Sequence, residues 1–300
     1  MILDLPNTTT VDINSELLKL RKEGGVVTIG RVMTLVIDAT DADAEEAIRT
    51  ANSASREHPC RIIVLSPQED SEHLDGQIRV GGDAGASEVI VLRPPLSAMD
   101  HADTLITPLL LPDAPIVAWW ASVVPLVPSA TGIGAMAQRR ITDAKGTASP
   151  SAVLCSLSDG YRPGDTDLAW TRITRWRALL ASALDQVSDQ RVTKARIHGD
   201  VNSPSILLLG AWLRKSLGCE FEASYDPEAT GLVSVCLDTP SGVISIDRPD
   251  GLNATLSQPG QPPHIITLPS RSQARCLAEE LRRMDNDPVY GEALQQIAHC

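Results

Sequence analysis

Residues 26–65 read VVTIGRVMTLVIDATDADAEEAIRTANSASREHPCRIIVL and carry the clearest structural signal in the chain. The segment opens with a run over 26–37 that is rich in β-branched residues, which favour strands. Asp41 is then placed to cap an alanine-rich helix that ends near Ser55, and a second strand follows over 61–65. One face of this helix carries small and apolar residues: Ala44, Ala47, Ile48 and Ala51. A strand, a helix and a strand in this order predict an α/β layer with a partly parallel sheet.

The same alternation extends outward on both sides of this segment. A helix is predicted over 14–22, before the first strand, because apolar residues recur there at helical spacing. Further strands are predicted over 77–80, 88–92 and 116–120, with a short helix from Asp100 between the last two. Prolines and glycines are frequent from residue 125 to 164, so we place a domain boundary near residue 146. Residues 1–145 then form an N-terminal α/β domain.

Residues 146–300 predict a second, mixed α/β domain. Asp167 can cap a helix that runs to about Leu184, and a strand over 192–197 leads into a helix over 203–217. The last third contains short alternating runs joined by proline- and glycine-containing turns, which are typical of an antiparallel meander. These runs cover 232–237, 243–247, 252–256 and 264–268, and a helix over 271–284 follows them.

Charge and composition exclude several classes of protein. The chain has 26 Lys and Arg against 38 Asp and Glu, a net charge of −12, which argues against a general nucleic-acid or anionic-membrane binder. The apolar stretch over 109–127 contains Pro112, Pro115 and Pro125, so it does not predict a membrane helix. The six cysteines form no C-x-x-C pair. The first residues of the sequence lack the basic region of a signal peptide. We therefore expect reduced thiols and a cytoplasmic location.

A search for catalytic and ligand motifs finds little. Gly132 and Gly134 formally match G-x-G-x-x-A, but no clean strand precedes them, as a dinucleotide fingerprint requires. The run 56–60 places a glutamate, a histidine and a cysteine together, and we interpret it as a structural corner between a helix and a strand. No serine-nucleophile motif and no paired histidine spacing occur. We predict no catalytic residue, no metal and no cofactor.

Two features leave alternatives open. The turn that contains Gly81, Gly82 and Gly85 is either a simple turn with positive φ angles or an anion nest of backbone amides. Trp119 and Trp120 end an apolar strand, and adjacent strand residues point to opposite faces. Both rings are buried only if both faces of the sheet are covered; otherwise one ring is exposed as a contact for a partner.

Arg139 and Arg140 lie close to these tryptophans in sequence and are candidates to bind a partner's carboxylate. Together with Trp119 and Trp120 they form the candidate partner contact, and a solvated helix end is the alternative interpretation.

Several longer segments resemble one known family, the bacterial glucose-6-phosphate dehydrogenase assembly proteins, also called OpcA. The resemblance runs along almost the whole chain. It rests on LPNTTT (5–10), GRVMTL (30–35), ASREHPCR (54–61), RVGGDAGASE (79–88), PLLLPDAPIVAWW (108–120), QRRITD (138–143) and RPGDTDLAWTR (162–172). Several long words in the same order are far more specific than a single glycine motif.

The resemblance implies a protein that turns over no substrate of its own. It implies an assembly and activating factor that binds glucose-6-phosphate dehydrogenase, favours its active oligomer, and so supports NADPH production in the oxidative pentose phosphate pathway. A competing hypothesis is an enzyme or sensor that binds a sugar phosphate or nucleotide through the turn from Gly81 to Gly85. A third is a structural scaffold without an effect on rates.

Overall fold

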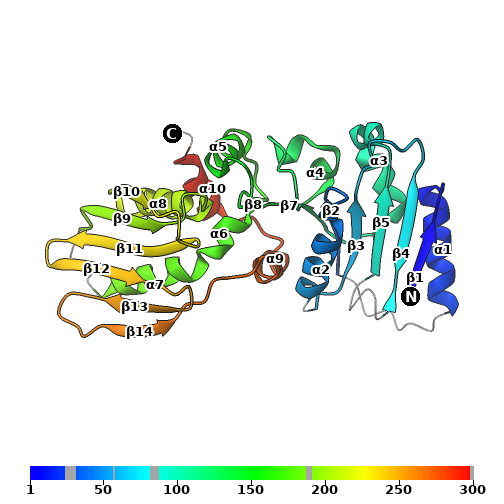
Figure 1. The fold of residues 1–300 in the computed structure, drawn as a ribbon. Helices are drawn as coiled ribbons and strands as arrows, with labels where there is room; N and C mark the ends of the chain where they lie inside the picture. The colour runs from blue at the N-terminus through cyan, green and yellow to red at the C-terminus, as the bar shows by residue number, and fades with distance from the viewer. Residues whose placement is uncertain (24–31, 57, 82–87, 187–190, 298–300) are drawn as a thin grey trace. The chain divides into compact units, whose positions relative to one another are not determined.

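The computed structural model describes residues 1–23, 32–56, 58–81, 88–186 and 191–297 (Figure 1). The chain divides into two compact units. Unit 1 comprises Met1–Thr142 and Gln273–Asn286, and unit 2 comprises Asp143–Ser272 and Asp287–Cys300. Each unit combines helices with a β-sheet, which confirms the predicted α/β fold class.

Unit 1 is built on a mostly parallel sheet. Within the unit its strand order is β1-β4-β5-β3-β2-β6-β7. Strands β5, β3, β2, β6 and β7 run parallel to one another, whereas β4 pairs antiparallel with β5 and β1 pairs antiparallel with β4. The strands are β1 (Ile2–Leu5), β2 (Met33–Asp38), β3 (Cys60–Leu65), β4 (Asp75–Arg79), β5 (Glu88–Arg93), β6 (Ile116–Trp120) and β7 (Arg139–Thr142).

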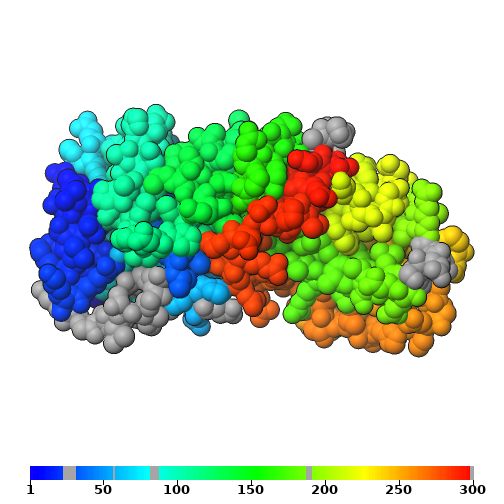
Figure 2. Space-filling view, turned by 180° about the vertical axis from the view of Figure 1, so that it is seen from behind, coloured from blue at the N-terminus to red at the C-terminus, as the bar shows by residue number. Residues whose placement is uncertain are grey.

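Helices cover both faces of this sheet because its central strands are apolar throughout. Residues of α1, α3 and α4 share one hydrophobic core with alternate residues of the strands, such as Val36 and Ile63. On the opposite face α2 packs beside α9, which Figures 1 and 2 both show. The helices are α1 (Thr10–Glu23), α2 (Ala44–Ala54), α3 (Ala102–Ile106), α4 (Gly132–Met136) and α9 (Gln273–Leu281), with 3-10 turns η2 (Leu96–His101), η3 (Thr107–Leu109) and η4 (Pro128–Ala130).

Strand β2 and helix α2 largely match the strand and helix predicted from residues 26–55, with two differences. Strand β2 begins at Met33, and residues 26–31 of the predicted strand lie outside the described residues. Asp41 does not cap α2, because the helix begins at Ala44 and the Asp41 carboxylate instead lies 3.6 Å from Arg93. The predicted inner face of the helix is confirmed, since its members are all buried: Ala44, Ala47, Ile48 and Ala51.

Unit 2 contains the sheet β10-β9-β11-β12-β13-β14. The predicted meander is confirmed, because β11 to β14 pair consecutively and antiparallel. The sequence did not predict β10, which pairs parallel with β9. The elements are α5 (Pro150–Gly160), β8 (Asp165–Asp167), α6 (Leu168–Arg172), α7 (Thr174–Asp185), β9 (Lys194–Gly199), α8 (Pro204–Leu217), β10 (Glu220–Tyr225), β11 (Leu232–Thr239), β12 (Gly242–Asp247), β13 (Asn253–Ser257), β14 (His264–Thr267) and α10 (Pro288–Gln295).

The single helix predicted over 167–184 is in fact two helices. Asp167 caps α6 as predicted, since its carboxylate accepts a hydrogen bond of 2.8 Å from the Ala169 N–H. The chain then leaves helical geometry at Ile173, and α7 starts at the next residue. The predicted apolar stripe persists across this break, because its members are all buried: Ile173, Trp176, Leu180 and Ala183.

Among the helices of the described residues, none has the length and apolar character that a membrane crossing needs. The apolar stretch over 109–127 forms β6 and the loops on either side of it.

Candidate functional site

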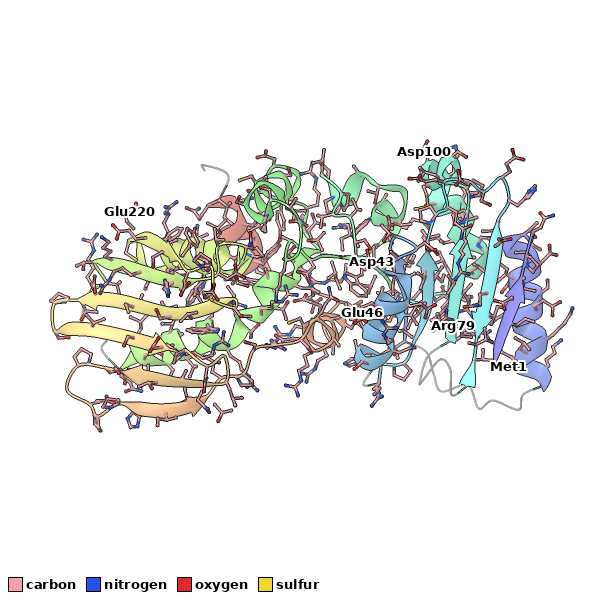
Figure 3. The ribbon with its side chains drawn as sticks, viewed as in Figure 1. Met1, Asp43, Glu46, Arg79, Asp100 and Glu220 are labelled. Carbon is pink, nitrogen blue, oxygen red and sulfur yellow. The ribbon has the colours of Figure 1, made fainter. Side chains whose placement is uncertain are left out.

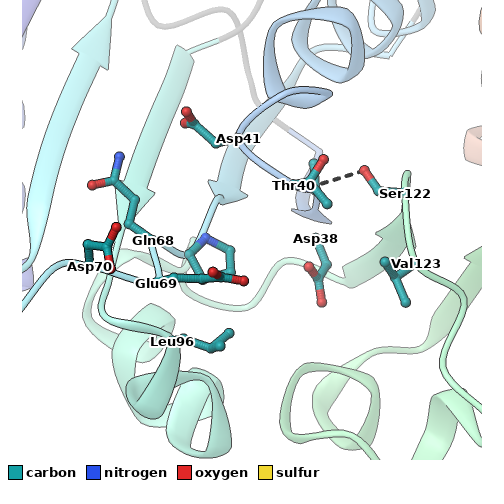
Figure 4. A pocket seen from close by; sticks show the side chains of 11 residues that line it. Asp38, Thr40, Asp41, Gln68, Glu69, Asp70, Leu96, Ser122 and Val123 are labelled. Atoms are coloured by element: carbon teal, nitrogen blue, oxygen red, sulfur yellow. Dashed lines mark hydrogen bonds between the residues drawn. The ribbon is translucent and has the colours of Figure 1, made fainter.

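A crevice in unit 1 opens at the carboxyl ends of the parallel strands (Figure 4). Strands β3 and β5 follow β2 in the chain and lie on one side of it in the sheet. Strands β6 and β7 come later in the chain and lie on the other side of β2. In open α/β sheets, ligands bind at this point where the strand order reverses. The crevice has a volume of about 610 Å³. Its lining residues are Asp38, Ala39, Thr40, Asp41, Pro67, Gln68, Glu69, Asp70, Leu96, Ser122 and Val123.

The crevice is acidic. Asp38 ends β2, Asp41 lies in the following turn, and Glu69 and Asp70 follow β3, whereas no lining residue is basic. Burial raises the pKa of Asp38 from 3.8 to about 6. Side chains from separate strand ends therefore concentrate negative charge around one cavity.

Hydrogen bonds hold the turn between β2 and α2. The Thr40 N–H donates to Ser122 Oγ at 3.1 Å (Figure 4), and the Thr40 hydroxyl donates to Asp43 at 2.7 Å. The hydrogen bond from Thr40, with a second from Ser122, lowers the pKa of the Asp43 carboxyl. Asp43 lies at the amino end of α2 (Figure 3), so this carboxylate stays charged there.

The turn does not fit a dinucleotide. In dinucleotide-binding sheets a glycine-rich turn after the first strand brings the pyrophosphate onto the amino end of the following helix. Here residues 39–43 are Ala-Thr-Asp-Ala-Asp, without a glycine, and Glu45 and Glu46 occupy the first turn of α2. A pyrophosphate at this position would meet several carboxylates, which repel it.

The formal glycine motif at Gly132 and Gly134 has a packing role. A Cβ at Gly134 would lie 1.8 Å from the carbonyl oxygen of Pro128, so the backbone approaches too closely for any other residue. The Thr131 hydroxyl accepts a hydrogen bond of 3.0 Å from the Gly134 N–H and caps the short helix α4. These contacts explain both the glycine and the threonine without a phosphate.

The predicted anion nest is only partly within the described residues. Gly81 is exposed and has a φ of 73°, a conformation that favours glycine. Gly82 and Gly85 lie outside the described residues, so the nest stays a prediction.

Of the two alternatives for the tryptophans, the structure shows burial of both rings. Trp119 is 0% exposed and Trp120 is 2% exposed, because helices cover both faces of the sheet at β6. Trp120 belongs to the core that α1, α3 and α4 share. Neither ring offers a surface to a partner in this fold.

Arg139 and Arg140 are also buried, with exposed fractions of 2% and 7%. Arg139 forms an ion pair with Glu280 and donates a hydrogen bond of 3.1 Å to the Asp285 carbonyl. Arg140 donates at 2.7 Å to the carbonyl of Ala137. These guanidinium groups hold unit 1 together, so the predicted partner contact of Trp119, Trp120, Arg139 and Arg140 is corrected to a structural role.

Within the described ranges, the cysteines and histidines form no evident reactive centre. Cys60 is fully buried at the start of β3, where a substrate does not reach it, and Glu57 lies outside the described residues. Burial raises the thiol pKa of Cys219 and Cys236. Cys300 lies outside the described residues. No group of three or more His, Cys, Asp or Glu side chains within the described residues is arranged to hold a metal.

An exposed apolar rim that the motifs did not predict lies beside the crevice. Val123 and Leu126, in the loop after β6, are 70% and 74% exposed, and Leu96 is 54% exposed. Val123 and Leu96 also line the crevice. The sequence feature that could have predicted this rim is the group of apolar residues between prolines in the loop over 121–128. Such a loop has little apolar surface to pack against.

Comparison with solved structures shows the fold alone. The chain is similar to KijD10, a 3-ketoreductase from Actinomadura kijaniata in complex with TDP-benzene and NADP, with 9% identity and a TM-score of 0.50 over 90% of this chain and 95% of that one. It is also similar to an oxidoreductase from Sinorhizobium meliloti, with 9% identity and a TM-score of 0.50 over 89% of this chain and 94% of that one.

Family models match most of the chain. The model described as the glucose-6-phosphate dehydrogenase subunit N-terminal domain matches residues 51–159, and the model of the C-terminal domain of that subunit matches residues 163–294. No curated protein sequence matches the chain. With both of its family domains in order along one polypeptide, the chain belongs to the OpcA family of glucose-6-phosphate dehydrogenase assembly proteins.

Proposed function

We propose that this chain is a non-catalytic assembly and activating factor that binds glucose-6-phosphate dehydrogenase and favours its active oligomer. The observation that carries the proposal is the pair of family domains, both of which are described as parts of a subunit of that dehydrogenase. The crevice supports it, because carboxylates line the place where a dinucleotide-dependent enzyme needs phosphate-binding groups. The chain then acts in NADPH production through its partner.

The mechanism follows from linkage. A protein that binds the active oligomer more tightly than the inactive form shifts the population toward that oligomer, by no more than its differential affinity. A tenfold preference supplies about 1.4 kcal/mol. No acid, base or nucleophile of this chain takes part in the reaction under this mechanism.

The exposed rim of the crevice is the proposed contact surface. Exposed apolar side chains that lie together next to a cavity mark interaction sites more often than scattered ones do. Leu96 and Val123 of this rim line the crevice, Leu126 follows farther along the same exposed loop as Val123, and the carboxylates of Glu69 and Asp70 lie in the crevice. This combination suits a partner segment that presents a basic side chain between apolar ones.

To test the proposed function, the chain is mixed with the dehydrogenase from the same organism, and the rate of NADPH formation and the particle mass are measured together. Wild type should raise both. The double variant Val123→Asp and Leu126→Asp should raise neither, because it places charge on the apolar rim. The matched control is Ile265→Asp, at an 80% exposed apolar position on β14, and it should act like wild type.

The outcomes separate the proposals. Activation by the double variant at the wild-type level would remove the rim as the contact surface. If wild type changes neither rate nor mass, the proposed function itself fails. Co-purification with the dehydrogenase at unchanged kinetics would instead indicate a scaffold.

The competing hypothesis is an enzyme or sensor for a sugar phosphate or nucleotide at the turn that contains Gly81. The fold it shares with oxidoreductases favours this hypothesis. Titration of the chain alone with glucose 6-phosphate and NADP tests it. Saturable binding that Gly81→Val removes would support the alternative, since only that variant alters the turn.

A further inference from the structure

A small pocket in unit 2 is lined by basic side chains. Its volume is about 70 Å³, and Lys145, Arg172, Arg248 and Arg271 all line it, together with four hydroxyl-bearing residues. No aspartate or glutamate lines it. All the charged residues that line this cavity are basic, in a chain with a net charge of −12.

Arg248 is the central group of this pocket. It is only 5% exposed, and its two Nη atoms donate to the carbonyl oxygens of Leu268 at 3.0 Å and Leu232 at 2.6 Å. Its guanidinium lies 5.0 Å from the centre of the Trp176 ring. Its Nε is buried without an acceptor, and within the described residues no carboxylate forms an ion pair with it.

Burial without a counter-charge is unfavourable for this guanidinium. Desolvation lowers the pKa of Arg248, because the charged form loses water that no nearby anion replaces. The nearest acidic influence is that of Asp250, which is fully exposed and accepts the N–H groups of Leu252 and Asn253 in a turn. A bound anion would compensate the buried charge, as carboxylates do for buried arginines elsewhere.

Two further arginines of the pocket are held in place. Arg172 donates to both oxygens of Asp143, at 2.7 and 2.6 Å, and Arg271 donates at 2.8 Å to the Thr171 carbonyl. These contacts fix the positions of both guanidinium groups, but Asp143 already neutralises the charge of Arg172, so Arg271 is the one of the two that adds positive charge to the pocket. Lys145 is exposed at the pocket and forms no ion pair within the described part of the chain.

The amino end of α8 adds a third kind of donor. Ser203 and Ser205 both line the pocket, and α8 runs over Pro204–Leu217. The first N–H groups of a helix have no partner within the helix, and the helix dipole favours an anion there. The Ser203 side chain precedes the helix but makes no capping hydrogen bond. Its hydroxyl is therefore available to a ligand.

We propose that this pocket binds the phosphate group of a small anion, either inorganic phosphate or a phosphate monoester. The buried guanidinium, the exposed ammonium, the serine hydroxyl and the helix amino end together provide donors on several sides of the cavity. Its volume of about 70 Å³ holds one phosphate group, so the remainder of a monoester lies outside. The site belongs to unit 2 and is separate from the crevice of unit 1.

Calorimetric titration of the full-length chain at low ionic strength tests the proposal, with inorganic phosphate, glucose 6-phosphate and acetate as separate probes. Both phosphates should bind at one site, more tightly than acetate, and added salt should weaken them. Tighter binding of glucose 6-phosphate would identify a monoester, and equal binding would identify free phosphate. Acetate that binds as tightly as phosphate would overturn the assignment.

Variants locate the site. Lys145→Gln and Ser203→Ala remove donors at the pocket surface, and each should weaken phosphate binding by about tenfold, the usual cost of losing a hydrogen bond to a charged group. Lys194→Gln removes an exposed lysine of the same unit that pairs with Glu222, and it should bind as wild type does. Equal binding by wild type and both pocket variants would overturn the proposal.

Arg248→Lys tests the buried group, with urea unfolding as the readout of folding. A variant that folds and loses phosphate binding supports the site. Should it fail to fold, the result for Lys145→Gln and Ser203→Ala decides. Absence of saturable phosphate binding by the wild-type chain overturns the inference outright.

Discussion

At the scale of single residues, Glu88 shows how unit 1 tolerates buried charge. Its side chain is 1% exposed on β5, and it accepts hydrogen bonds from Arg21 at 3.1 and 2.6 Å and from Arg61 at 3.0 Å. Arg61 is itself only 3% exposed on β3. The carboxylate thus links α1, β3 and β5 and neutralises a guanidinium that has no access to water.

Replacement of Glu88 by alanine should lower the free energy of unfolding by about 3–5 kcal/mol, because it removes a buried carboxylate that pairs with the buried guanidinium of Arg61. Urea unfolding measures this loss. The control is Glu46→Ala, since Glu46 is 67% exposed and pairs with Arg49 on the surface of α2. That change should cost less than about 1 kcal/mol. Equal losses for the two variants would contradict the interpretation.

Asp38 should make stability depend on pH. Its folded pKa of about 6 lies above the ordinary value of 3.8, so the folded chain holds the proton more tightly than the unfolded chain. The contribution of this group to stability is therefore greatest below about pH 4 and is lost as the pH rises to about 6. Above that pH, the folded chain carries an unfavourable charge on a partly buried carboxylate.

Asp38→Asn should raise the free energy of unfolding by up to about 3 kcal/mol at pH 8 and change it little at pH 4. Urea unfolding at the two pH values measures the difference. Asp70→Asn, at an exposed carboxylate of the same crevice, controls for the removal of charge alone. A gain of the same size at both pH values would show that burial of Asp38 is not the cause.

At the scale of elements, α10 depends on one residue outside it. Asp287 precedes the helix, and its Oδ1 accepts from the N–H groups of Val289 at 3.0 Å and Tyr290 at 3.1 Å. Its Oδ2 accepts from the Trp170 indole at 2.8 Å, which joins α10 to α6. One carboxylate therefore satisfies the helix end and a buried indole together.

Asp287→Ala should lower the free energy of unfolding by about 2–4 kcal/mol, because both the cap and the indole lose their acceptor. Asp287→Asn keeps one acceptor oxygen and should cost less. Urea unfolding followed by tryptophan fluorescence measures both variants. A loss below about 1 kcal/mol for the alanine variant would show that neither hydrogen bond matters to stability.

Some helices and strands could be predicted from sequence patterns alone, and others could not. The apolar spacing predicted α8 and β6 almost to the residue, because local periodicity and caps specify them. Strands β1 and β10 were missed, since each has exposed positions on an edge and lacks a strong apolar run. The break at Ile173 was missed as well, because the buried stripe continues through both helices.

At the scale of the whole molecule, the fold and the chemistry of the crevice point in different directions. The fold is similar to that of oxidoreductases, one of them in complex with NADP. The crevice at the carboxyl ends of the parallel strands is acidic, and the turn after β2 contains no glycine. Fold similarity does not carry over the chemistry of a site.

The chain should therefore show no saturable binding of NADH in a fluorescence titration. NADH is the appropriate probe because it carries a pyrophosphate but lacks the phosphate monoester that the unit 2 pocket is proposed to take. A complementary titration with the triple variant Asp38→Asn, Asp41→Asn and Asp43→Asn tests whether charge alone excludes it. Saturable binding of NADH by the wild-type chain would refute the interpretation of the crevice.

Local patterns along the chain were enough to establish its α/β class, the central strands, the meander and the family resemblance. Apolar periodicity is a property of residues that are close together in the sequence, so it can be recognised in the sequence alone. Exposure and convergence are not local, because they depend on which distant segments pack together. Packing buried Trp119, Trp120, Arg139 and Arg140, which had appeared suited to a partner. The acidic crevice and the basic pocket around Arg248 exist only because folding brings together residues that are far apart in the chain.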